Sequence, residues 1–221
     1  MSLATNRLFF SFLLIFSSLS QADVADITRI FHATPNLNQF EICQGGGCAQ
    51  NDKTSLSEAE WQLVSTLFVP APTNAQAERE QIALAIGLLE EIVGQKIGTS
   101  NDRAGTFDNS DYQGQQDCND EAINSTTYIR LLKQNGLMQF HAIEDMRTRN
   151  FFFTGWPHTT AVVREIETAE RYAVDSWFYD NGHAATIVPL VVWKANYQPE
   201  DSPIGKDRSS STELITVHVN Q

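Results

Sequence analysis

The hydrophobic pattern of this 221-residue chain changes its period near Gly136, and that change restricts the fold more than any other feature. Before Gly136, apolar residues recur at the three- and four-residue spacing of helices. After it, segments rich in Val, Ile, Phe, Tyr and Thr are typical of strands. Helices followed by strands predict an α+β fold, with N-terminal helices packed on an antiparallel β-sheet.

The predicted helices have recognisable ends. Ser57 and Glu60 form the capping-box pattern at the start of the first helix, which Pro70 ends. Gly98 ends the second helix, and Asp117 is a natural N-cap for the third. The predicted helices span residues 57–69, 74–97 and 118–135, and the predicted strands span residues 137–145, 159–167, 171–179, 185–194 and 213–219.

Residues 1–22 have the pattern of a secretory signal peptide. Arg7 precedes an apolar run over residues 8–19, which is shorter than the about 20 residues that span a bilayer. Small residues then allow cleavage after Ala22. An uncleaved anchor is the alternative interpretation. No other segment is long and apolar enough to span, so we expect an exported protein, periplasmic or secreted, with no membrane contact after cleavage.

The charge of the chain argues against one class of partner. With 15 Lys+Arg against 27 Asp+Glu, the formal net charge is −12. Binding to nucleic-acid phosphates requires a basic surface, so we expect no nucleic-acid partner.

The chain has three cysteines, which leaves one thiol over if the other two pair. Cys43 and Cys48 flank a run of three glycines that allows a sharp turn, and an exported chain meets an oxidising environment. We therefore predict a Cys43–Cys48 disulfide. A metal site is the alternative, but the pair lacks the histidines of a zinc site. Cys118 stays free, and a buried, inert residue is its simplest interpretation.

Cys118 nevertheless has a position that suits a nucleophile. It begins the third predicted helix, where backbone amides and the helix dipole stabilise a thiolate or an oxyanion. Nearby Asp117 and Asp120 oppose this effect, so a partner base is needed. His158 begins a predicted strand, and Asp175 lies within the otherwise apolar next strand. Two antiparallel neighbours can bring His158 and Asp175 together as base and orienting acid.

Three short motifs carry a resemblance to a known family: DCNDEA at 117–122, HTTAV at 158–162 and AVDSW at 173–177. They resemble the transglutaminase-like branch of the papain-like cysteine peptidases, and are closest to the bacterial transglutaminase-like cysteine proteinases. The resemblance implies a papain/transglutaminase-like core over residues 112–221, preceded by an N-terminal helical and loop region over 23–111.

The resemblance also implies an activity and a set of roles. Cys118 would attack a carbonyl, His158 would take its proton and Asp175 would hold the imidazole, with a protein or peptide as substrate. Many members have a glycine where this chain has Gln116 and an aromatic residue where it has Thr159-Thr160, so the resemblance leaves hydrolase and transferase open.

The sequence leaves open two features of the predicted site: the donor to the oxyanion and the presence of a calcium ion. The Cys118 amide is one oxyanion donor, and a side-chain amide is expected from one of three glutamines, Gln113, Gln115 and Gln116. Members of the proteinase branch can bind calcium near the nucleophile, and the matching hard oxygens are those of Asp117, Asn119, Asp120, Asp108 and Asp111. A solvated acidic loop explains the same residues without calcium, so no cofactor or metal is expected.

The sequence thus predicts an exported thiol-dependent acyl-transfer enzyme, a cysteine peptidase or amidase that works through a thioester. Three alternatives remain. One is a transglutaminase that uses an amine acceptor, and another is a non-catalytic binding module on the same fold. A secreted structural protein whose Cys118 is part of the core is a third.

Overall fold

The computed structural model describes residues 34–107, 113–149 and 157–204, and they have the α+β organisation that the sequence predicts. Strands β3 to β6 form an antiparallel sheet in that order, and β1 and β2 pair separately. The elements are β1 (Phe40–Gln44), β2 (Gln50–Thr54), α2 (Glu58–Thr66), α3 (Ala75–Ile97), α4 (Cys118–Gln134), β3 (His141–Arg149), β4 (His158–Glu165), β5 (Arg171–Asp175), β6 (Thr186–Pro189) and α5 (Leu190–Lys194).

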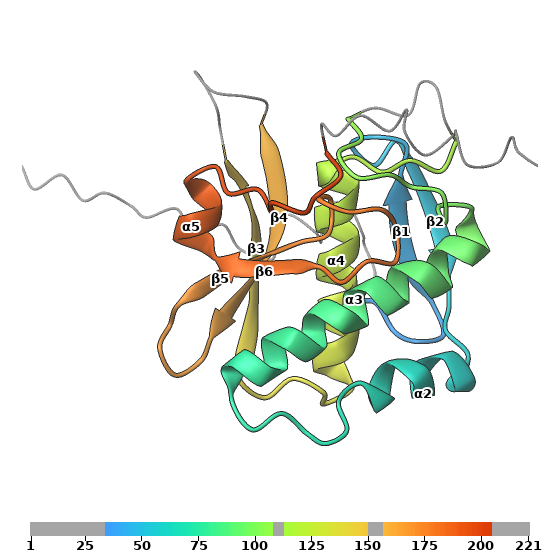
Figure 1. Cartoon of the computed structure of the whole chain (residues 1–221). Helices are drawn as coiled ribbons and strands as arrows, with labels where there is room; N and C mark the ends of the chain where they lie inside the picture. Colours follow the sequence, from blue (N-terminus) through green and yellow to red (C-terminus); the bar gives the residue numbers. More distant parts are fainter. Residues whose placement is uncertain (1–33, 108–112, 150–156, 205–221) are drawn as a thin grey trace, which may run out of the picture.

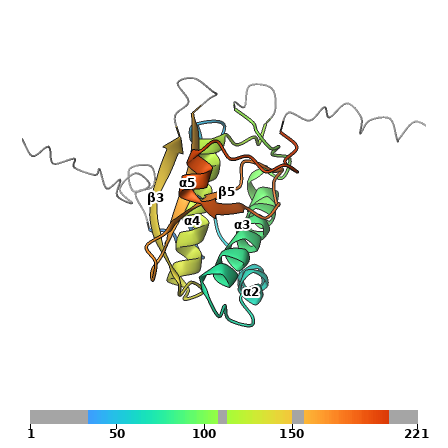
Figure 2. The same cartoon turned by 60° about the vertical axis from the view of Figure 1, so that its left-hand side comes forward.

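Helix α4 lies at the centre of the fold (Figure 1). The four-stranded sheet covers one side of it, the β1–β2 hairpin packs on another, and α3 crosses it on the face away from the sheet (Figure 2). Most residues of α4 are buried, including polar ones. Thr126 and Thr127 satisfy their hydroxyls by donating to carbonyls one turn earlier in the helix.

The caps that the sequence predicts are present. Ser57 accepts from the Glu60 amide while Glu60 accepts from the Ser57 amide, which closes the capping box of α2. Asn74 caps α3, and Gly98 ends that helix with a positive φ of 87°. Asp117 caps α4 and accepts from the amides of the second and third residues of the helix. The predicted helix ends agree with the observed ones within one residue, except that α2 ends at Thr66, three residues before the predicted end.

Several strand predictions need correction. The predicted strand 171–179 ends at Asp175, and the predicted strand 137–145 begins only at His141 and continues to Arg149. The predicted strand 185–194 is a strand only over β6, and the chain then turns into α5. The helical turn brings Leu190 and Trp193, three residues apart, into the core, while Val191 and Val192 become exposed. Packing of Trp193 therefore overrides the β-propensity of the valines. Strands β1 and β2 were not predicted because β2 is polar throughout, and the predicted strand 213–219 lies outside the described residues.

The turn between α4 and β3 is fixed to α3 by a buried carboxylate. Glu78 accepts from the backbone amides of Gln139, Phe140 and His141, and from Nδ1 of His141 at 2.9 Å. Burial alone would raise the pKa of Glu78, but the hydrogen bonds from His141 and these amides lower it below its ordinary value. The side chains of Glu78 and His141 are fully buried, so this contact has no access to water.

We expect Glu78→Ala to lower the free energy of unfolding by about 2–4 kcal/mol, because it leaves several buried donors without an acceptor. Denaturant titration of the variant and of wild type measures the difference. Glu80→Ala, which removes an exposed carboxylate from the same helix, is the matched control and should change the stability little. Equal stability of the two variants would contradict this role for Glu78.

Candidate active site

Cys118, His158 and Asp175 each lie at the end of a secondary-structure element. Cys118 is the first residue of α4, His158 is the first of β4 and Asp175 is the last of β5. Because β4 and β5 are antiparallel neighbours, the start of one lies beside the end of the other. The fold thus places all three residues at the ends of their secondary-structure elements.

His158 and Asp175 form a buried hydrogen-bonded pair. Nε2 of the imidazole lies 2.7 Å from Oδ2 of the carboxylate, and the two side chains are only 3% and 2% exposed. The other ring nitrogen, Nδ1, is buried and has no hydrogen-bond partner within the described residues. An ionised carboxylate only accepts, so Nε2 carries the proton and Nδ1 of a neutral ring offers its lone pair.

Aromatic rings surround the imidazole on several sides. The ring centroid of His158 lies 4.4 Å from that of Trp177, 5.4 Å from Trp193 and 5.5 Å from Phe178. These rings belong to an apolar cluster that is separate from the main core and also contains Cys118. The imidazole therefore works in surroundings from which water is largely excluded, where its interactions with charge are strong.

Cys118 lies against the chain on both sides of His158. Its Sγ is 4.0 Å from the carbonyl oxygen of Pro157, which accepts from the thiol, and the backbone amide of Thr159 also hydrogen-bonds to the sulfur. The residue is only 6% exposed. The sulfur thus contacts the backbone of the two residues that flank His158.

The thiol of Cys118 is harder to ionise than its place at a helix start suggests. Burial, together with the charges of Asp117 and Asp175, raises its pKa to about 11, although the backbone amides of Thr159 and Cys118 itself act in the opposite direction. The effect of the helix terminus is therefore outweighed by desolvation. Cys118 is protonated at neutral pH in this structure, and its activation requires transfer of the proton to a base.

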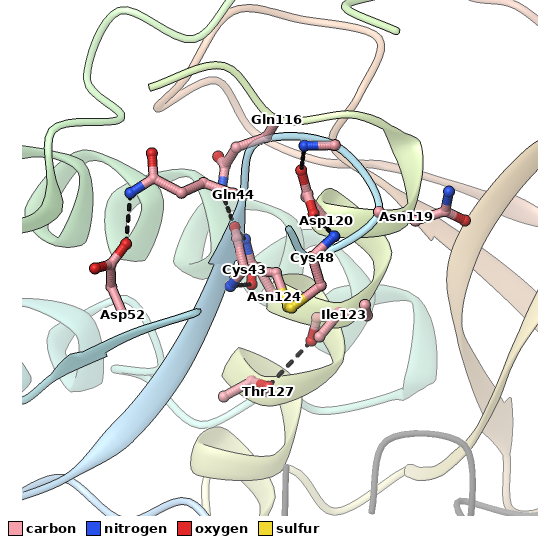
Figure 3. Close-up of a disulfide and its surroundings, with 12 residues drawn as sticks. Cys43, Gln44, Cys48, Asp52, Gln116, Asn119, Asp120, Ile123, Asn124 and Thr127 are labelled. Atoms are coloured by element: carbon pink, nitrogen blue, oxygen red, sulfur yellow. Dashed lines mark hydrogen bonds between the residues drawn. A yellow bond between two sulfur atoms is a disulfide. The ribbon is translucent and has the colours of Figure 1, made fainter. Parts of the chain in front are cut away.

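The predicted Cys43–Cys48 disulfide is present and closes a loop that lies over the start of α4 (Figure 3). The loop presents its backbone amides to the helix: those of Gly46 and Cys48 donate to Asp120 at 2.7 and 2.6 Å, and that of Gly47 donates to Asp117. The turn requires positive φ angles at three successive glycines. The disulfide loop therefore donates hydrogen bonds to Asp117 and Asp120, the two carboxyl groups of the first turn around Cys118.

These contacts bear on the calcium candidates. Both oxygens of Asp117 and both of Asp120 accept backbone amides, and Asn119 is exposed. Burial and the charge of Asp117 raise the pKa of Asp120 to about 6, although the amides work against this. No group of three or more metal-ligating side chains is arranged to hold an ion in the part of the chain that the structure describes, and Asp108 and Asp111 lie outside that part. Calcium binding at these residues stays an untested alternative to the solvated acidic loop.

The three glutamines have different environments. Gln115 donates its side-chain amide to the carbonyl of Asn101, and Gln116 donates its amide to the carbonyl of Cys43. Both side chains are buried and connect loops, while Gln113 is exposed. The backbone amides of Thr159 and Cys118 are the donors that the structure directs to the sulfur. The sequence identified the Cys118 amide but missed that of Thr159, which only the strand geometry shows.

A buried group of three carboxyls next to the site was not predicted. Glu121 of α4 hydrogen-bonds to Glu90 of α3 and to Asp102, and it accepts from Ser176, the neighbour of Asp175, at 2.5 Å. A signal was present in the sequence, because Glu90 continues the apolar helical stripe of Ile82 and Ile86. Such carboxyls can share this space only when protons lie between them.

The electrostatics of this carboxyl cluster follow from burial. Burial, and then the charge of Glu121, raise the pKa of Asp102 to about 10 and that of Glu90 well above its ordinary value. Burial also raises the pKa of Glu121. The folded protein therefore keeps protons on this cluster at a pH where the same groups of the unfolded chain are ionised.

Within the described residues, no helix combines the length and the apolar composition that a membrane span requires. Comparisons of the chain with models of known protein families, with curated proteins and with solved structures find no match. The resemblance to transglutaminase-like proteinases therefore stays a prediction based on three short motifs.

The carboxyl cluster predicts a stability that falls as the pH rises. Above the ordinary carboxyl pKa of about 4, the folded state binds more protons than the unfolded state. The free energy of unfolding therefore falls by about 1.4 kcal/mol per pH unit for each retained proton. We expect Glu90→Gln, whose side chain is neutral at every pH, to reduce the fall in the free energy of unfolding between pH 5 and pH 8. Denaturant titrations at several pH values measure this free energy for the variant and for wild type.

The matched control is Glu91→Gln, which neutralises an exposed carboxylate at the next position of the same helix. It should leave the pH dependence of stability close to that of wild type. A Glu90→Gln protein with the same slope as wild type would show that the cluster ionises freely in the folded state.

Proposed function

We propose that this protein is an exported thiol-dependent acyl-transfer enzyme, a cysteine peptidase or amidase that acts on a protein or peptide substrate. The observation that carries the proposal is the state of His158. One ring nitrogen binds a buried carboxylate. The other is buried without a partner among the residues that the structure describes, and the Cys118 sulfur contacts the backbone on both sides of His158. A structural histidine in the core would ordinarily have both nitrogens satisfied.

The residues support a general-base mechanism rather than a preformed thiolate. Sγ of Cys118 attacks the substrate carbonyl as its proton passes to Nδ1 of His158, and Asp175 stabilises the imidazolium that forms. The amides of Cys118 and Thr159 stabilise the negative charge on the carbonyl oxygen. His158 then protonates the leaving amine as the C–N bond breaks, which leaves a thioester on Cys118.

The same groups act again in the second half of the reaction. Water attacks the thioester and gives its proton to His158, and the Cys118 thiol leaves and regains that proton. An amine in place of water would make the enzyme a transglutaminase. Nothing among the described residues favours an amine over water, so hydrolysis is the simpler proposal.

Export is part of the proposal and has two lines of support. Residues 1–22 have the pattern of a signal peptide, and they lie outside the described residues. The Cys43–Cys48 disulfide is of the kind that persists in an oxidising compartment.

Native labelling with iodoacetamide tests the proposal, because Cys118 is the only thiol outside the disulfide. At pH 7 we expect labelling of Cys118 that depends on His158, since a buried thiol of high pKa needs a base. His158→Gln should lower the rate at least about tenfold and move the remaining reactivity above pH 9. Peptide mass mapping gives the site and the rate.

His183→Gln is the matched control, because it removes an exposed histidine outside the site. Its labelling rate should equal that of wild type. Asp175→Asn, which keeps the size of the side chain, gives a second reduced rate if His158→Gln fails to fold by circular dichroism. A native Cys118 that reacts equally in wild type and in both site variants would contradict the proposed function.

A further inference from the structure

Asp175 accepts a second hydrogen bond that the proposed mechanism has not used. The indole Nε1 of Trp193 donates to Oδ2 of Asp175 at 2.6 Å. This is the same oxygen that lies 2.7 Å from Nε2 of His158. Trp193 is fully buried, so its N–H has no access to water and the two donors converge on one carboxylate oxygen.

Trp193 is itself held in place from a third strand. Arg149, the last residue of β3, lies opposite His158 in the β3–β4 register. Its guanidinium lies over the indole ring, 4.6 Å from the centroid, and donates to the backbone carbonyls of Trp193 and Tyr197 at 2.7 and 2.9 Å. The indole is thus fixed both through its ring and through the backbone of α5.

We propose that Trp193 is a positioning residue of this site: its indole N–H fixes the Asp175 carboxylate so that His158 presents Nδ1 to the Cys118 thiol. The inference rests on the proposed function. Without the indole donor, Oδ2 of Asp175 has one fewer partner, so the carboxylate rotates more freely and places more of its negative charge on His158. Both effects reduce the amount of neutral, correctly oriented imidazole at a given pH: the ring is less well oriented, and it keeps its second proton to a higher pH.

A second tryptophan supplies a matched comparison. Trp177 packs even closer to the His158 ring, at 4.4 Å, but its Nε1 donates to the carbonyl of Thr106 and not to Asp175. Replacing either residue by phenylalanine keeps an aromatic ring beside His158. Only Trp193→Phe removes a donor from the carboxylate, so the two variants separate hydrogen bonding from packing.

The test measures the rate of Cys118 labelling by iodoacetamide against pH for wild type, Trp193→Phe and Trp177→Phe. In wild type the rate rises with the deprotonation of His158, which gives an acid limb. We expect Trp193→Phe to move the midpoint of this limb up by about 0.5–1 pH unit and to lower the plateau rate about tenfold. The midpoint of Trp177→Phe should stay at the wild-type value.

The outcomes distinguish this inference from the proposed function. If wild type shows no acid limb or no labelling of Cys118, the proposed function fails and the inference fails with it. If wild type shows the limb and the midpoint of Trp193→Phe is unchanged, or both variants shift equally, the proposed function stands and the positioning role is overturned.

A measurement on wild type covers the case in which Trp193→Phe does not fold. One indole N–H resonance in a ¹H–¹⁵N spectrum should titrate with the midpoint of the acid limb, because its acceptor is the carboxylate that faces His158. If no indole resonance titrates at that midpoint, the inference is overturned.

Discussion

Burial of the Asp175 carboxylate is the constraint on which the rest of the site depends. A buried carboxylate is costly unless charged or polar donors satisfy it. Here two donors meet on Oδ2: the imidazole of His158 from β4 and the indole of Trp193 from α5. The short helix α5 exists where β-propensity favoured a strand because it brings Trp193 to this oxygen. The buried carboxylate on β5 thus connects β4 and α5 and orients the imidazole of His158.

The start of α4 is organised by a second set of carboxylates. Asp117 and Asp120 cap the helix that begins with Cys118, and the charge of Asp117 disfavours a thiolate there. The loop closed by the Cys43–Cys48 disulfide covers them with backbone amides (Figure 3). The N-terminal hairpin therefore stabilises the position of Cys118 without lowering its pKa below that of an ordinary thiol. This explains why the geometry supports transfer of the proton to His158 at the moment of attack.

Local signals predicted much of this arrangement, and long-range effects account for the rest. Capping residues such as Ser57, Asn74 and Asp117 act within one turn, so the sequence predicted the helix ends and the α+β class. The pairing of His158 with Asp175 followed from the order of two strands. The environment of Cys118, by contrast, depends on desolvation by side chains such as Trp177 that are distant in sequence. The same holds for the carboxyl cluster around Glu121, whose partners come from separate elements.

We propose that Cys118 forms a thioester through the His158–Asp175 pair. Brief incubation of the native protein with a p-nitrophenyl acyl ester, followed by an acid quench and peptide mass mapping, tests for this thioester. We expect one acyl group, found on Cys118 in wild type, and no acylated peptide from this region in Cys118→Ala. A folded wild-type protein that releases p-nitrophenol without acylating Cys118, or that acylates only lysines, would contradict it.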